Sequence, residues 1–255
     1  MLLTIDIGNT NIKIGVYRGD QLLAHWRMAT ERHKLADEYA VVIHSLFDLA
    51  GLDTRAVEGC ALSCVVPPLT EQFRALSRSY LNVEPVIIGP GVATGLRYAI
   101  DTPDQLGADR IANSLAAYRK YGAPAIAIAF GTATAFDVIT EGGEYIGGAI
   151  APGIGISADA LFRLAARLYQ VELVRPPQVI GKNTVHYMQS GLLLGYAGLV
   201  EGLVRRMQDE LGRPCSVIAT GGLADVIAGE TTAITAVEPY LTLEGLRMIY
   251  EMNRA

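Results

Sequence analysis

The residue types best suited to chemistry follow the first apolar run, where residues 6–11 read Asp-Ile-Gly-Asn-Thr-Asn. A carboxylate at the end of a buried strand can meet a hydrated Mg²⁺ ion. The glycine lets the backbone approach an anion closely, and the N–H groups of the turn, with its Asn and Thr side chains, can donate hydrogen bonds to phosphate oxygens. An ordinary tight turn uses the same residue types, so this segment alone leaves both interpretations open.

A second glycine turn, Gly131-Thr132-Ala133-Thr134, repeats the first in the second half of the chain. The pattern that starts at Asp6 restarts at Ala129, an offset of 123 residues (129 minus 6). Because two facing turns would clamp a phosphate chain, this recurrence favours phosphate binding. The chain has no G-x-x-x-x-G-K-[ST] loop and no G-x-G-x-x-G that opens a helix, so any such site differs from a P-loop or a Rossmann turn.

A third group, Gly107-Ala108-Asp109-Arg110, stands at the start of a predicted helix. An acidic residue beside the positive end of a helix is typically worth about 0.3–1 kcal/mol, and the arginine could be solvated, so a structural role explains both. Alternatively, Asp109 could accept a proton from a substrate hydroxyl while Arg110 holds a substrate carboxylate. Chemistry alone favours the structural interpretation.

The helix predicted over Val185–Leu211 follows Thr184, which is a plausible N-cap. Four glycines recur on one face of it, and each interior glycine costs about 1 kcal/mol relative to alanine. They are Gly191, Gly195, Gly198 and Gly202. Close approach of another backbone would explain them, either a core strand or a partner subunit, and we expect a homodimer interface near this helix. The chain offers no nucleophile elbow and no supported Cys/His pair, so positioning and electrostatics, as in phosphoryl transfer, fit the residues present.

Hydrophobic periodicity predicts the elements that position these residues. We expect strands at Leu2–Asp6, Ile12–Tyr17, Gln21–Met28, Val57–Val66, Pro85–Ile88, Ala125–Phe130, Phe136–Thr140, Tyr145–Ile150 and Pro214–Thr220. We expect helices at Leu35–Ala50, Leu69–Tyr80, Leu106–Tyr121, Ser157–Tyr169, Val185–Leu211 and Leu243–Asn253, with a loop over residues 89–103. Both halves therefore follow the order strand, glycine turn, hairpin, helix, strand, helix. Such a duplication predicts two similar α/β lobes, residues 1–121 and 122–255, that face each other across a cleft.

Composition limits the possible partners. The 255 residues include 21 Lys and Arg against 26 Asp and Glu, a net charge of −5, which gives no basic footprint for nucleic acid or an anionic membrane. No apolar run reaches the roughly 18 residues of a membrane span, and the N-terminus lacks the basic leader of a signal peptide. Three cysteines form neither a disulfide framework nor a metal quartet. We therefore expect a cytoplasmic protein.

Seven motifs in order along the chain resemble those of the type III pantothenate kinases. They are residues 6–11, Gly95-Leu96-Arg97-Tyr98, residues 107–110, Phe130-Gly131-Thr132-Ala133-Thr134, residues 147–153, Ala219-Thr220-Gly221-Gly222-Leu223-Ala224 and residues 241–246. Each motif is weak alone, and the combination is specific. The resemblance implies duplicated actin-like (ribonuclease H-like) lobes, mixed sheets flanked by helices, with the active site in the cleft between the lobes.

The resemblance also implies a reaction, ATP-dependent phosphorylation of pantothenate, the first step toward coenzyme A. It implies Asp109 as the proton acceptor and Asp6 near Mg²⁺, through water. It implies ATP phosphates bound by Asp6, Ile7, Gly8, Asn9, Thr10, Asn11, Ile12, Lys13 and Thr132. It implies pantothenate bound by Tyr98, Gly107, Ala108, Asp109, Arg110 and Thr184, the last from the neighbouring subunit of a homodimer.

Position 129 departs from the family pattern, in which an Asp before Phe-Gly-Thr-Ala-Thr-Thr is a ligand of a monovalent cation, K⁺ or NH₄⁺. This chain has Ala129 there and Ala135 in place of the last Thr. Asp137 or another carboxylate could compensate. We expect an active kinase with altered cation dependence; the alternatives are a silent relative that binds nucleotide or pantothenate as a regulator, and a kinase for another small hydroxylated acid.

Overall fold

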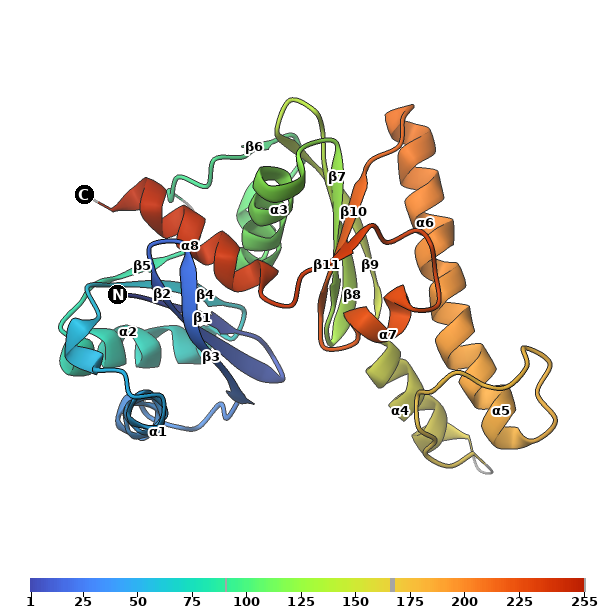
Figure 1. Ribbon diagram of the computed structural model, residues 1–255, viewed down its shortest axis with the longest axis horizontal. Coiled ribbons are helices and arrows are strands. Elements are labelled where there is room, and N and C mark those ends of the chain that lie inside the picture. The colour runs from blue at the N-terminus through green and yellow to red at the C-terminus, as the bar shows by residue number, and fades with distance from the viewer. Residues whose placement is uncertain (90, 166–167, 255) are drawn as a thin grey trace. The chain divides into compact units, whose positions relative to one another are not determined.

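The computed structural model describes residues 1–89, 91–165 and 168–254. Contacts divide the chain into two compact units, each with its own sheet (Figure 1). The first unit comprises residues 1–96, 101–116 and those from Leu241 onward, and the second comprises residues 97–100 and 117–240. These units are not consecutive in sequence, because the last helix packs on the first sheet. The predicted division into duplicated lobes, residues 1–121 and 122–255, concerns a repeat in the sequence and stays a prediction.

The first unit is built on a mixed sheet, which in the described residues has five strands in the order β3-β2-β1-β4-β5. They are β1 (Leu2–Ile7), β2 (Asn11–Arg18), β3 (Gln21–Ala29), β4 (Gly59–Cys64) and β5 (Pro85–Ile87). Its helices are α1 (Ala36–Leu49), α2 (Pro67–Leu81), α3 (Ala108–Tyr121, whose last turn belongs to the second unit) and α8 (Leu241–Asn253), with short 3₁₀ turns η1 (Thr54–Ala56) and η2 (Pro103–Gln105).

The alternation of β1 decides which of its side chains reach the functional face. Leu3, Ile5 and Ile7 are fully buried in a core that includes side chains of α1 and α2. Successive residues of a strand point to opposite faces, so Thr4 and Asp6 lie on the other face. That face carries α8, whose Leu243 lies close to Gly15 on β2. A single strand thus supplies both the core and the carboxylate.

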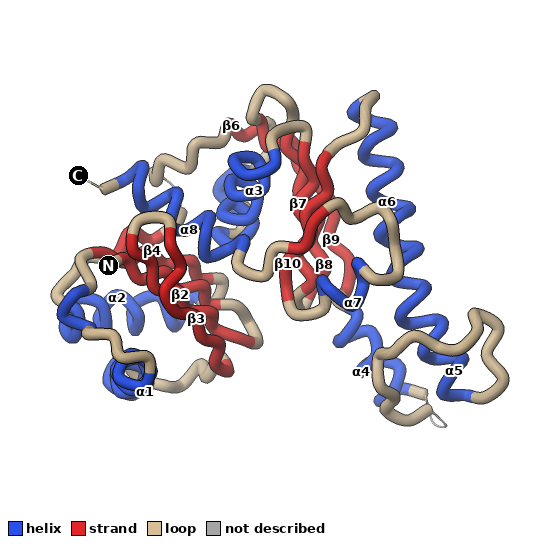
Figure 2. The backbone as a smooth tube through the Cα atoms, in the orientation of Figure 1, coloured by secondary structure: helices blue, strands red, loops and turns tan. Residues whose placement is uncertain are grey.

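The second unit repeats the plan with a sheet of six strands among the described residues, in the order β11-β10-β7-β8-β9-β6 (Figure 2). They are β6 (Arg97–Tyr98), β7 (Ala125–Phe130), β8 (Ala133–Ile139), β9 (Glu144–Pro152), β10 (Ser216–Gly221) and β11 (Ala236–Val237). Its other helices are α4 (Ile154–Leu164), α5 (Thr184–Gln189), η3 (Ser190–Leu194, a π-helix), α6 (Gly195–Leu211) and α7 (Ala224–Ala228). Side chains of α4, α6 and α7 share a core with one face of this sheet.

The predicted elements are present, with differences at boundaries that periodicity cannot fix. The helix expected over Ser157–Tyr169 is α4, which begins earlier and ends at Leu164; residues 166 and 167 of the expected range lie outside the described residues. The helix expected over Val185–Leu211 consists of α5, a π-helical turn and α6. The expected loop over residues 89–103 contains the two-residue strand β6, too short for any alternation to reveal. Within the described residues, no helix has both the length and the apolar character needed to span a bilayer.

Candidate active site

Asp6, the last residue but one of β1, carries a buried carboxylate that is only partly satisfied. Its side chain is 4% exposed, and its register neighbours are Lys13 on β2 and Ser63 on β4. Lys13 Nζ lies 3.3 Å from Oδ2, whereas Oδ1 is buried and has no hydrogen-bond partner among the described residues. A buried carboxylate oxygen without a partner is costly, so it marks a place for a cation or an ordered water. The carboxylate fits the predicted Mg²⁺ site.

The turn after Asp6 is closed by a bond within its own backbone and is supported by two side chains that follow β3. The N–H of Gly8 donates to the carbonyl of Asn11 at 3.0 Å, and a Cβ at Gly8 would also lie 3.0 Å from that oxygen. The hydroxyl of Thr30 donates to the carbonyl of Gly8 at 2.7 Å, and Arg32 contacts Asn9 Oδ1 at 3.3 Å. Asn9 and Thr10 remain exposed at the tip. Thr30 and Arg32 support this turn, a role that the sequence analysis missed because they lie on the far side of a hairpin.

Asp109 lies in the first turn of α3, and its carboxylate takes the space where a side chain at position 107 would be. A Cβ on Gly107 would stand 2.7 Å from Asp109 Oδ1. The carbonyl of Gly107 accepts from the N–H groups of Arg110 and Ile111 at 3.0 and 3.1 Å, which starts the helix. Gly107 thereby fixes both the helix start and the position of the acid.

Val65 joins this helix start to the end of β1. Its N–H donates to the carbonyl of Ile7 at 3.0 Å, and its Cγ1 lies 3.8 Å from the Cβ position of Gly107. Asp6 and Asp109, 103 residues apart in sequence (109 minus 6), therefore belong to neighbouring segments of one unit. This proximity depends on a valine that no motif singled out.

Cys64 is the last residue of β4, paired with Ile7 of β1, and it lies close enough to Asp6 for the carboxylate charge to affect its pKa. Burial raises the pKa of its thiol, hydrogen bonds to Thr70 and to the carbonyl of Val66 oppose this, and the Asp6 carboxylate raises it further. Burial also raises the pKa of Cys60 to about 12. Both thiols stay protonated at neutral pH, so neither is a thiolate nucleophile.

Tyr98, in the second unit, is placed by a pair of buried side chains. It lies beside Tyr145 in the parallel pairing of β6 with β9, and the two rings have centroids 6.2 Å apart. The hydroxyl of Tyr145 donates to Asp137 Oδ1 at 2.6 Å, and both residues are at most 1% exposed. A short bond to a buried carboxylate is strong and fixes the ring, so Tyr145 in turn fixes the surface on which Tyr98 packs.

The surroundings of Ala129 contain little that could hold a cation. Its register neighbours are Ala135 on β8 and Thr220 on β10, so their side chains share its face of the sheet. Thr220 is 1% exposed, and its hydroxyl has no hydrogen-bond partner among the described residues. Asp137 lies on the same face but pairs with Ala127, two residues before Ala129. It is therefore a diagonal neighbour of Ala129, and such neighbours are about 7–8 Å apart.

Thr132 is exposed in the turn before β8, and Thr184 is half-buried at the start of α5. The predicted N-cap is displaced by one residue: the Asn183 side chain, not that of Thr184, accepts from the N–H of His186 at 3.0 Å. Thr184 instead lines a hollow of about 340 Å³ with Leu161, Tyr187, Met188 and Gly191, among others.

The family model described as type III pantothenate kinase matches residues 2–206. A type III pantothenate kinase of Roseiflexus sp. (strain RS-1) is 74% identical over 255 residues, and the match covers 100% of both chains. One of Roseiflexus castenholzii is 73% identical over 254 residues, again with 100% of both chains covered.

The chain belongs to the type III pantothenate kinase family. Its members are phosphotransferases, and the relatives named here carry that activity in their names and give no support to a silent regulator. A crystal structure of an inorganic polyphosphate/ATP-glucomannokinase from Arthrobacter sp. strain KM has a TM-score of 0.53 at 18% identity, with 99% of both chains covered. This likeness shows the fold alone, and it confirms the predicted class of mixed sheets flanked by helices in an actin-like kinase fold.

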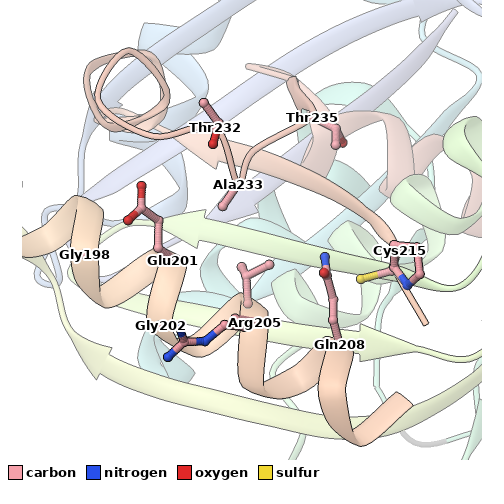
Figure 3. A pocket seen from close by; sticks show the side chains of 11 residues that line it. Gly198, Glu201, Gly202, Arg205, Gln208, Cys215, Thr232, Ala233 and Thr235 are labelled. Carbon is pink, nitrogen blue, oxygen red and sulfur yellow. The ribbon is translucent and has the colours of Figure 1, made fainter. Parts of the chain in front are cut away.

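In this family member a further hollow of about 590 Å³ lies between α6, the start of β10 and residues 232–235 (Figure 3). Glu201, Arg205 and Gln208 face it from α6, opposite Thr232 and Thr235. None of the predicted ATP or pantothenate residues lines it. The predicted residues of the first unit instead meet at the end of β1 and the start of α3.

Proposed function

We propose that this chain transfers the γ-phosphoryl group of ATP to the primary hydroxyl of pantothenate, with Asp109 as the group that accepts the hydroxyl proton. The observation that carries the proposal is the joining of Asp6 and Asp109 through Val65 in one unit. One carboxylate near the phosphates and one near the acceptor hydroxyl are the two acids that this reaction needs. Family membership supplies the identity of the acceptor.

The binding of ATP with a divalent ion follows from the kinase family, and Asp6 fits the ion. Within residues 1–89, 91–165 and 168–254, no three His, Cys, Asp or Glu side chains gather into a metal site. Mg²⁺ in kinases is held by one or two carboxylates together with substrate phosphates and water, which suits a single buried carboxylate with one unpartnered oxygen. The ion, when bound, neutralises charge on the phosphates. Gly8 to Lys13 and Thr132 are the proposed phosphate contacts.

Pantothenate recognition is proposed for Tyr98, for residues 107–110 and for Thr184. A guanidinium matches a carboxylate with two parallel N–H bonds, so Arg110 suits the carboxylate of pantothenate. Asp109 is proposed to contact the end of the substrate that carries the hydroxyl. Tyr98 offers a half-buried ring backed by Tyr145.

A homodimer is the proposed assembly. The space directly over Gly191, Gly195 and Gly198 is open, because no atom outside the backbone of their own helix lies within 4 Å of their Cβ positions; Gly198 also lines the hollow opposite residues 232–235. The adjoining surface of α4, α5 and the segment between them exposes large apolar side chains: Ile156 44%, Leu161 38%, Leu164 87%, Tyr169 56%, Val174 42%, Val179 70%, Ile180 77% and Tyr187 59%. A second copy of this chain would cover both, and it would bring its own Thr184 to the pantothenate site.

The cytoplasm is the proposed location, because the reaction consumes ATP and feeds coenzyme A synthesis.

The residues present suit Mg²⁺, but they do not suit the monovalent cation of the family. Ala129 and Ala135 offer it no side-chain oxygen, so the residues present do not fit it.

The test of the proposed function is ADP release from MgATP with and without pantothenate, in wild type and in Asp109→Asn. Loss of a general base costs typically about 10²–10⁴-fold in rate, so we expect the variant to bind both substrates and to lose turnover by that factor. Asp104→Asn, an exposed acid in the preceding η2 turn, is the matched control and should keep full activity. Full activity in Asp109→Asn would refute the role of Asp109, and no pantothenate-dependent turnover in wild type would refute the kinase assignment.

A further inference from the structure

The sheet face at Ala129 lacks the oxygen atoms that a monovalent cation needs. An ion such as K⁺ exchanges its hydration shell for several oxygen ligands. The strand register gives Ala129 a methyl group on one side, from Ala135, and one hydroxyl on the other, from Thr220. The nearest carboxylate in this register is that of Asp137, one step further along β8, which is fully buried and engaged by Tyr145.

The unpartnered hydroxyl of Thr220 is a second, independent observation that the face at position 129 lacks a carboxylate. Paired residues on neighbouring strands stand about 4.8 Å apart, so a carboxylate at position 129 would lie within reach of the Thr220 hydroxyl. A buried hydroxyl left without a partner costs about 1–3 kcal/mol. A carboxylate at position 129 could accept the hydrogen bond of the Thr220 hydroxyl, and the methyl group of Ala129 cannot.

We propose that this kinase, whose proposed function the inference rests on, transfers phosphate without a monovalent cation at position 129. A carboxylate with a bound cation has a net charge of zero, and so does an alanine. Replacing both ions with a methyl group leaves the net charge near the phosphates unchanged, and it removes the cost of burying two ions.

The experiment compares initial rates of ADP release in KCl, NH₄Cl and tetramethylammonium chloride at equal ionic strength, with MgATP and pantothenate saturating. Wild type should keep its rate within about twofold across the three salts, a difference below 0.5 kcal/mol in barrier. The rate of Ala129→Asp should be about tenfold or more higher in KCl or NH₄Cl than in tetramethylammonium chloride. The new carboxylate adds a negative charge, which only a bound K⁺ or NH₄⁺ ion would neutralise. Ala129→Asn is the matched control, since it can accept from Thr220 but carries no charge, and it should remain indifferent to the salt.

A second readout does not depend on turnover. K⁺ should raise the unfolding midpoint of Ala129→Asp and leave those of wild type and Ala129→Asn unchanged, because only a bound ligand stabilises the folded state. A wild-type rate that falls about tenfold or more without K⁺ or NH₄⁺ overturns the inference and leaves the kinase function intact. A folded Ala129→Asp that ignores K⁺ in both rate and midpoint also overturns it. No turnover of wild type in any salt overturns the kinase function, and this inference with it.

Discussion

At the scale of a single residue, Gly107 determines where the proposed base lies. The Asp109 carboxylate occupies the space that a side chain at position 107 would fill. A Cβ there would stand 2.7 Å from Oδ1, closer than any real contact allows, and the short Asp side chain must turn away. The sequence predicted that residues 107–110 act together. The structure adds that the glycine acts through the acid beside it.

Gly107→Ala should therefore keep its fold and lose turnover. A displacement of about 1 Å in a catalytic group costs on the order of 10²-fold, so we expect kcat to fall about 10–100-fold. Circular dichroism and thermal unfolding would check the fold, and ADP release the rate. Gly229→Ala, where a Cβ meets only ordinary contacts at 3.6 Å, is the control and should leave the rate unchanged. Unchanged kcat in Gly107→Ala would mean that Asp109 has room elsewhere.

At the scale of elements, the pairing of β6 with β9 decides where Tyr98 lies. The N–H of Arg97 donates to the carbonyl of Gly143 at 3.2 Å, and that of Ala99 donates to the carbonyl of Tyr145 at 2.9 Å. A strand of two residues has little stability of its own, so it depends on β9 and on the Tyr145 ring. The bond from Tyr145 to Asp137 makes that ring rigid.

Tyr145→Phe should raise the KM for pantothenate several-fold while the KM for ATP stays within about twofold, since only the Tyr98 side of the site loses its support. It should also lower the free energy of unfolding by about 1–3 kcal/mol, because a buried carboxylate loses a donor. Steady-state kinetics for each substrate and chemical denaturation would measure the two effects. Tyr80→Phe removes an exposed bond to Asp37, 2.7 Å long, and should change neither KM. Equal rises in both KM values would indicate a general loss of structure and refute a specific role.

At the scale of the whole molecule, the open glycine face of η3 and α6 governs the proposed assembly. Four glycines in or near one helix destabilise it by about 1 kcal/mol each. In the described part of the chain, no other segment packs directly on Gly191, Gly195 or Gly198 to offset this cost. Leu161 of α4 and Tyr187 of α5, both exposed, line a hollow together with Gly191. A closed twofold interface would bury both at once.

Wild type should sediment as a dimer at micromolar concentration, and Gly195→Arg should sediment as a monomer, because a long charged side chain would enter the closest approach. If Thr184 serves the partner's site, the monomer should also lose pantothenate-dependent turnover by about tenfold or more. Ser45→Arg, on the exposed face of α1, is the control and should remain dimeric. A monomeric wild type with full activity would remove the proposed dimer.

The sequence by itself determined the order of elements and the family, and it proposed the chemical residues, because these depend on local periodicity and on motifs a few residues long. The apolar run already placed Asp6 at the end of a buried strand, next to a glycine turn. The tertiary structure alone decided that Val65 joins Asp109 to the end of β1, that Tyr145 and Asp137 support Tyr98, and that Thr220 lies beside Ala129. These relations depend on strand register and on packing between segments far apart in the chain, which no local pattern encodes.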